Sequence, residues 1–267
     1  MDERPIGVFD SGLGGLTVLR EIMKVVPDEN IIYFGDTARV PYGPRDLGQV
    51  KKFVFRITRF LSEKNVKLIV IACNTSTAAA LDDLNNNYGI PIIGVIGPGA
   101  RTAVNNTANR KVGVIATRGT VNSRAYDKAI ARIGQGISVY SVAAPKLVEY
   151  VEKGILSGHS LDRAICGYIR PLLEKEIDVL IMGCTHFPLI EKNIAHCSGT
   201  NVKVISSAVE TARDVKEMLD SKGIRAYRGR KPVRIFYETG QGSHFFKVGK
   251  LFLGEEISHV ESINLEM

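Results

Sequence analysis

Two cysteines each follow a run of apolar residues and precede polar ones, a pattern typical of the end of a buried strand. Cys73 lies in the stretch LIVIACNTSTAAA, and Cys184 lies in VLIMGCTHFP with His186 two residues further on. The residues after Cys73 predict a helix, and the partial positive charge at a helix N-terminus lowers a thiol's pKa from its usual value of about 8.5. We therefore expect two reactive thiols.

The sequence upstream of each thiol shows a second, weaker repetition. The stretch IGVFDSGLGG near the N-terminus resembles VGVIATRGT near the middle of the chain. Asp10 precedes Cys73 by 63 residues, and Ala116 precedes Cys184 by 68 residues. This spacing predicts two related halves, and ligands of parallel α/β sheets bind beyond the carboxyl ends of the strands. The two thiols are therefore expected to face one cleft from opposite sides.

Short apolar strands alternate with amphipathic helices along the whole chain, which predicts an α/β fold with parallel sheets and right-handed crossovers. Residues 208–267 are expected to return to the first half, and the segment GPGA at residues 97–100 is expected to be the loop that crosses between domains. We predict two pseudo-symmetric domains, each a mostly parallel sheet flanked by helices, with the active site in the cleft between them. The first comprises residues 1–97 plus 208–267, and the second residues 98–207.

Composition narrows the class of protein. The chain has 267 residues, is 45% apolar and has no apolar run of 18 residues, and its first residues lack the apolar core of a signal peptide. We therefore expect a cytoplasmic protein that does not bind membranes. The net charge of +7 is scattered except for one basic cluster at residues 225–234, so no nucleic-acid partner is expected. The four cysteines form no CxxC pair and are expected to be reduced, with Cys166 and Cys197 as small buried side chains.

The glycines of DSGLGG, with Asp36 closing the next strand, partly match a dinucleotide-binding fingerprint. The match is incomplete because Thr17 stands at the third glycine position and Asp10 carries a carboxylate where a pyrophosphate would approach. The plainer interpretation is a tight turn from strand to helix.

Two other chemistries involve the second thiol. A metal site formed by Cys184, His186 and either His196 or Cys197 would lack a matching second pair of ligands, so no metal is expected. A cysteine–histidine nucleophile for acyl transfer would use Cys184 and His186 but leaves Cys73 unexplained.

Two thiols across a cleft suit removal of a proton from one face of a carbon and return of a proton to the other face. Acid and base exchange roles between the two directions, so a pseudo-symmetric pair suits mirror-image substrates. An α-proton beside a carboxylate is weakly acidic, and the site must stabilise developing negative charge. Groups suited to this are the hydroxyls and backbone N–H groups of Ser11, Asn74, Thr75 and Thr185. The residues therefore favour racemisation.

Five ordered motifs resemble those of the glutamate racemases in the aspartate/glutamate racemase family. They are DSGLGGLTV, GDTARVPYG, ACNTSTA, GVIAT and GCTHFPL, and the likeness extends to TGQGSHFFKVGKLFLG near the C-terminus. The resemblance implies a bacterial enzyme that interconverts L-glutamate and D-glutamate without a cofactor, supplies D-glutamate for peptidoglycan and forms a homodimer. Ser76 and Phe187 depart from residues common in relatives, but neither belongs to the implied chemistry.

The resemblance also implies roles for individual residues. Cys73 would take the α-proton from D-glutamate and Cys184 from L-glutamate, with the opposite thiol donating. Asp10 would assist Cys73, and His186 would assist Cys184. The residues implied to hold the substrate are Asp10, Ser11, Tyr42, Gly43, Asn74, Thr75, Thr117, Thr120, Thr185 and His186.

Other interpretations stay open from the sequence. Asp36 and Glu149 are further candidates for the site, and a helix cap or a surface charge explains each of them equally well. An aspartate racemase would share the two thiols, although the DSGLGG and PYG loops favour glutamate. A non-catalytic binding protein of the same fold is the alternative from another class.

Overall fold

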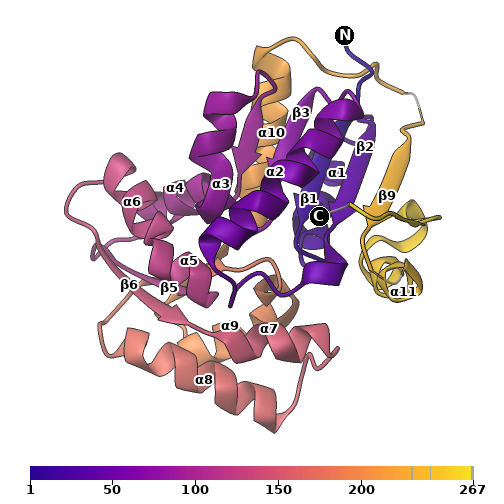
Figure 1. Cartoon of the computed structure of the whole chain (residues 1–267). Helices are drawn as coiled ribbons and strands as arrows, with labels where there is room; N and C mark the ends of the chain where they lie inside the picture. Colours follow the sequence, from indigo (N-terminus) through magenta and orange to yellow (C-terminus); the bar gives the residue numbers. More distant parts are fainter. Residues whose placement is uncertain (230, 241, 266–267) are drawn as a thin grey trace.

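The computed structural model describes residues 1–229, 231–240 and 242–265, which form two parallel sheets flanked by helices (Figure 1). Arg230, in the predicted basic cluster, and Gln241, in the C-terminal motif, lie outside the described residues. In the part of the chain that is described, no helix combines the length and apolar character needed to cross a membrane.

The first sheet has the strand order β10-β9-β2-β1-β3-β4, and all neighbouring strands are parallel. Alternate side chains of β1 belong to different cores: Ile6 and Val8 pack in the core that includes α1 and α10, and Phe9 packs in the core that includes α2. Because helices cover both faces, every residue of β1 is buried. The strands are β1 (Ile6–Asp10), β2 (Ile31–Gly35), β3 (Leu68–Ile71), β4 (Ile92–Gly94), β9 (Arg234–Glu238) and β10 (Glu261–Ser262). The helices are α1 (Leu16–Val25), η1 (Thr37–Arg39), α2 (Leu47–Glu63), α3 (Asn74–Asn87), α10 (Ser207–Ser221), α11 (Gly242–Leu253) and η3 (Gly254–Glu256).

The second sheet has the order β6-β5-β7-β8, again with parallel neighbours. One of its cores includes side chains of α4 and α6, and the other includes side chains of α7, α8 and α9. Its strands are β5 (Lys111–Ala116), β6 (Ser138–Ala143), β7 (Val179–Gly183) and β8 (Lys203–Ser206). Its helices are α4 (Ile96–Asn106), α5 (Arg118–Ser123), α6 (Ala125–Ile133), α7 (Pro145–Glu152), α8 (His159–Leu173), η2 (Phe187–Ile190) and α9 (Glu191–Ser198).

The two sheets repeat one topology. The run β2-β1-β3-β4 in the first sheet corresponds to β6-β5-β7-β8 in the second, with the first strand in sequence lying second in each run. Cys73 lies two residues after the end of β3 and Cys184 directly follows β7, so the two thiols occupy nearly equivalent places. The predicted α/β class with two pseudo-symmetric parallel sheets is confirmed, and the domain limits at residues 97 and 208 stay a prediction.

The segment GPGA at residues 97–100 is not the loop that the sequence predicts, because it lies within α4. Pro98 falls in the first turn of this helix, where backbone N–H groups have no partner within the helix and proline is tolerated. Ala100 and Ala103 are buried against the second sheet. Helix packing therefore overrides the turn propensity of the two glycines and the proline.

Two of the cysteines are bonded to each other, which corrects the predictions that all four are reduced and that Cys166 and Cys197 are buried, since Cys166 is exposed and Cys197 half-buried. Cys166 on α8 and Cys197 on α9 form a disulfide, with their Cα atoms 5.2 Å apart. The side-chain amide of Asn193 on α9 also donates a hydrogen bond of 2.7 Å to Asp162 on α8. Cys73 and Cys184 are the free cysteines of the described residues.

Candidate active site

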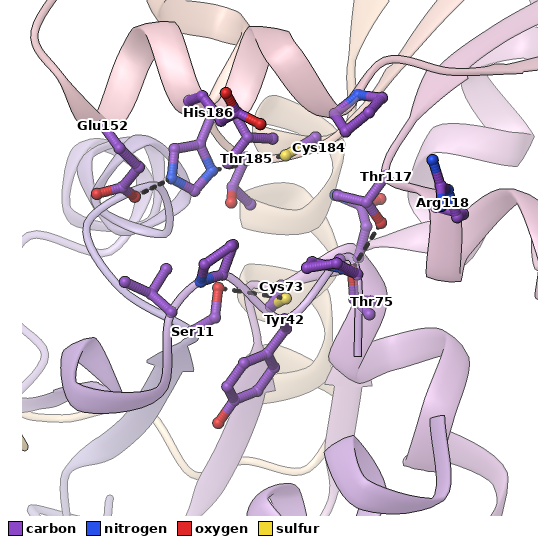
Figure 2. Close-up of a pocket in the computed structure, with 18 of the residues that line it drawn as sticks. Ser11, Tyr42, Cys73, Thr75, Thr117, Arg118, Glu152, Cys184, Thr185 and His186 are labelled. Atoms are coloured by element: carbon purple, nitrogen blue, oxygen red, sulfur yellow. Dashed lines mark hydrogen bonds and ion pairs between the residues drawn. The ribbon is translucent and has the colours of Figure 1, made fainter. Parts of the chain in front are cut away.

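A pocket of about 480 Å³ opens where the carboxyl ends of strands from the two sheets meet. Figure 2 shows the sulfur atoms of Cys73 and Cys184 reaching into it from opposite walls. The residues predicted from the sequence that line the pocket are Ser11, Tyr42, Gly43, Cys73, Asn74, Thr75, Thr117, Glu149, Cys184, Thr185 and His186. Asp10, Asp36 and Thr120 are buried beside the lining residues and do not line the pocket themselves.

Cys73 lies at the N-cap of α3, between β3 and the helix, as the sequence predicts. Its sulfur accepts a hydrogen bond from the backbone N–H of Ser76 at 3.4 Å and lies 3.8 Å from Oγ of Ser11. Burial, with a smaller contribution from the negative charge of Asp10, raises the pKa of the Cys73 thiol to about 12. The predicted lowering of this pKa is therefore wrong, because burial outweighs the hydrogen bond at the helix N-terminus.

Asp10 is the last residue of β1, and its carboxylate accepts hydrogen bonds from residues of both halves of the molecule. One carboxylate oxygen accepts a hydrogen bond from the backbone N–H of Gly12 at 2.9 Å, and the other accepts one from the hydroxyl of Thr185 at 3.3 Å. Burial raises the pKa of Asp10, although the charge of His186 and these hydrogen bonds oppose the rise. The carboxyl is thus shifted toward the neutral pH range, where it can exchange a proton.

Cys184 has a different set of neighbours. Its sulfur lies 3.5 Å from Nδ1 of His186, and Nε2 of the same ring lies 2.5 Å from a carboxylate oxygen of Glu152. Burial by itself lowers the pKa of His186, but the Cys184 sulfur and the Glu152 carboxylate outweigh it and hold this pKa well above its usual value. The imidazole is therefore protonated at neutral pH and presents a charged donor to the sulfur.

Glu152 is a site residue that sequence reasoning missed. It lies at the end of α7, 34 residues before His186, and it lines the pocket. Its local sequence, KLVEYVEK, predicts only an amphipathic helix with charged residues on its outer face. The packing of α7 against the loop after β7 brings the carboxylate to the ring, and no sequence signal marks that contact.

Tyr42 lines the pocket and is held in place by a hydrogen bond to Asp36. Its hydroxyl donates a hydrogen bond to Asp36, whose carboxylate also accepts hydrogen bonds from Arg39 at 2.8 Å and from the Thr239 hydroxyl at 2.7 Å. Burial and the charge of Asp36 raise the pKa of Tyr42. Asp36 is thus an anchor for Tyr42 and does not itself face the pocket.

Threonines from both halves meet on one wall of the pocket. The hydroxyls of Thr75 and Thr117 lie 2.9 Å apart, and Thr120 lies 3.0 Å from Thr117 behind them. Gly43 packs against the same wall, and a Cβ there would come within 2.7 Å of the Cβ of Thr117. Only glycine therefore permits this close approach of the loop to the second half.

Asn74, the residue after Cys73, has a side-chain donor at the pocket wall that finds no partner in the described part of the chain. Its side-chain oxygen accepts a hydrogen bond from the hydroxyl of Tyr126 at 2.8 Å. Among the described residues, nothing accepts a hydrogen bond from its buried Nδ2, although the residue lines the pocket. A buried N–H group without a partner is costly, so an acceptor on a bound ligand is the natural partner here.

The described residues contain no group of three or more histidine, cysteine, aspartate or glutamate side chains arranged to hold a metal ion. The alternative metal site that would use Cys197 is contradicted, because Cys197 is bonded to Cys166.

Comparison with known proteins places this geometry in a family. Residues 6–215 match the model of the Asp/Glu/Hydantoin racemase family. A glutamate racemase of Oceanobacillus iheyensis is 44% identical over 265 residues, which cover 99% of this chain and 96% of that protein. The chain therefore belongs to the Asp/Glu/hydantoin racemase family and is an isomerase.

Solved structures agree with this assignment. A glutamate racemase isoform from Bacillus anthracis superposes with a TM-score of 0.94 at 41% identity, covering 99% of both chains. A glutamate racemase from Francisella tularensis, solved in complex with D-glutamate, has a TM-score of 0.93 at 38% identity and covers 100% of this chain and 99% of that one. Within the family, the chain is thus similar to glutamate racemases over its whole length.

Proposed function

We propose that this protein interconverts L-glutamate and D-glutamate by a cofactor-independent two-base proton transfer between Cys73 and Cys184. The observation that carries the proposal is the position of two free, buried thiols on opposite walls of one pocket (Figure 2). The choice of glutamate is supported by relatives that are themselves glutamate racemases, one of them solved with D-glutamate bound.

In the direction from L- to D-glutamate, Cys184 removes the α-proton. The protonated ring of His186, 3.5 Å from the sulfur, stabilises the negative charge that Cys184 carries before it accepts the proton. Cys73 holds its proton at neutral pH because burial raises its pKa to about 12, so it is ready to donate to the opposite face of the carbon. The raised pKa values of Cys73 and His186 therefore support this direction.

The reverse direction requires Cys73 as the base. Its negative charge is opposed by burial and by Asp10, and it is stabilised by the N–H of Ser76. Asp10 assists by taking up the thiol proton, which its raised pKa favours. The two directions thus use different helpers on the two walls, Asp10 for Cys73 and the His186–Glu152 pair for Cys184.

The remaining lining residues bind and orient the substrate. Nδ2 of Asn74 supplies a hydrogen bond to a substrate carboxylate, because this buried donor lacks a protein partner among the described residues. The hydroxyl of Tyr42 is engaged by Asp36, so the ring of Tyr42 shapes the pocket wall. Hydroxyl and backbone N–H donors that stabilise developing negative charge come from Ser11, Gly43, Thr75, Thr117 and Thr185, with Thr120 supporting Thr117.

The cellular role proposed for this reaction is the supply of D-glutamate for peptidoglycan synthesis in the cytoplasm by a homodimer. This part of the proposal is supported by the motifs shared with glutamate racemases.

The reaction is tested with purified protein and no added cofactor. Either enantiomer of glutamate is expected to lose optical activity, measured by circular dichroism, until the two enantiomers are equal, and aspartate is expected to keep its optical activity. Binding of glutamate without any loss of optical activity would instead identify a binding protein. Racemisation of aspartate alone would identify an aspartate racemase.

A further inference from the structure

Arg118 is a cation on the pocket wall without an anionic partner. It is the first residue of α5, it is exposed, and it lines the pocket next to Thr117. Within the described part of the chain, its guanidinium has no ion pair and no hydrogen bond. Figure 2 shows Arg118 on the side of Thr117 and Thr75, away from His186 and Glu152.

The other charged side chains that line the pocket balance one another. Glu152 contacts the protonated ring of His186. Glu149 on α7 and Lys153 at its C-cap carry one negative and one positive charge, so they add no net charge to the lining. With Arg118, the charged side chains of the lining therefore carry a net positive charge.

We propose that Arg118 attracts the anionic substrate to the pocket and raises kcat/KM without taking part in proton transfer. The proposal rests on the proposed function, because glutamate carries two carboxylates and one ammonium group, a net charge of about −1 at neutral pH. An exposed guanidinium acting through water over about 5 to 10 Å changes capture of such an anion by about two- to fourfold.

Ionic strength separates this role from direct contact or a structural role. The Debye length, the distance over which an electrostatic attraction persists in salt solution, is about 30 Å at 0.01 M salt but only about 3 Å at 1 M salt. Long-range attraction therefore disappears at high salt. Three variants are compared at both salt concentrations: Arg118→Gln, Arg118→Lys, and Arg163→Gln as the matched control. Arg163 is exposed on α8 and does not line the pocket.

Arg118→Gln is expected to lower kcat/KM for glutamate about two- to fourfold at low salt, with kcat unchanged, and to equal the wild type at about 1 M salt. Arg118→Lys is expected to retain the wild-type value because it keeps the charge. Arg163→Gln is expected to match the wild type throughout.

The proposal is overturned if the loss in Arg118→Gln is the same at both salt concentrations, falls on kcat, or is reproduced by Arg163→Gln. These failures differ from failure of the proposed function. If the wild type does not racemise glutamate, the proposed function itself is wrong. If the wild type is active but the loss in Arg118→Gln does not depend on salt, only the proposed role of Arg118 is wrong.

Discussion

At the residue scale, the two thiols occupy equivalent positions but have unlike neighbours. Cys73 contacts Ser11 and the N–H of Ser76, and burial raises its pKa to about 12. Cys184 contacts the ring of His186, which is backed by Glu152. The pseudo-symmetric fold thus places two similar groups on either side of the substrate, and the neighbouring residues give each thiol its own way to gain or lose a proton.

The Glu152–His186 pair leads to a prediction about pH. Glu152→Gln keeps a hydrogen-bonding side chain but removes the negative charge that helps to raise the pKa of His186. The ring is then expected to lose its proton at lower pH, so the alkaline limb of kcat against pH for L- to D-glutamate moves to lower pH. The profile for the reverse direction is expected to move less, because Cys73 is the base there. Identical profiles for wild type and variant would show that Glu152 does not control His186.

The residues of the site differ in how far the sequence predicts them. Cys73 and Cys184 could be singled out because each follows an apolar run and precedes polar residues. The direction of the pKa shift of Cys73 could not be predicted, because a helix start is visible in the sequence whereas complete burial next to Asp10 is a tertiary property. Glu152 was missed for the same reason, since α7 meets His186 only in the fold.

At the scale of elements, most strands and helices follow from apolar periodicity, and the errors arise where packing overrides local preference. Residues 97–100 contain two glycines and a proline, yet they lie within α4, whose alanines pack against the second sheet. The pairing of Cys166 with Cys197 depends on α8 lying beside α9. The spacing of two cysteines on separate helices cannot reveal that arrangement.

The disulfide carries a prediction about stability. It closes a loop of 31 residues, and the loss of unfolded-chain entropy from a loop of that size stabilises the folded state by about 3.7 kcal/mol. A reductant is therefore expected to lower the free energy of unfolding of the wild type by about this amount, measured by urea denaturation. The double variant Cys166→Ala with Cys197→Ala serves as the control, and its unfolding is expected to be the same with and without reductant.

Racemisation should persist in that double variant, because neither Cys166 nor Cys197 lines the pocket. An unchanged free energy of unfolding when the wild type is reduced would show that this bond does not contribute to stability.

At the scale of the whole molecule, the site exists because two sheets of the same topology direct the carboxyl ends of their strands at each other. Polar contacts cross between the halves around the pocket: Thr75 lies 2.9 Å from Thr117, and Thr185 donates to Asp10. The α/β class and the repeat were predictable from the alternation of elements and the two similar motifs. The contacts across the pocket were not, because they depend on how the halves pack.

The central claim is that two different groups on opposite faces of the α-carbon exchange protons with it. The most direct measurement starts from L-glutamate in deuterated water and follows the α-position of both enantiomers by mass spectrometry at early times. We predict that the D-glutamate formed carries solvent deuterium while the remaining L-glutamate keeps its α-hydrogen, because Cys73 delivers a solvent-derived hydron and Cys184 holds the one it removed. Return of the original hydrogen to the product, or deuterium in unconverted L-glutamate at the same rate, would show that a single base serves both faces.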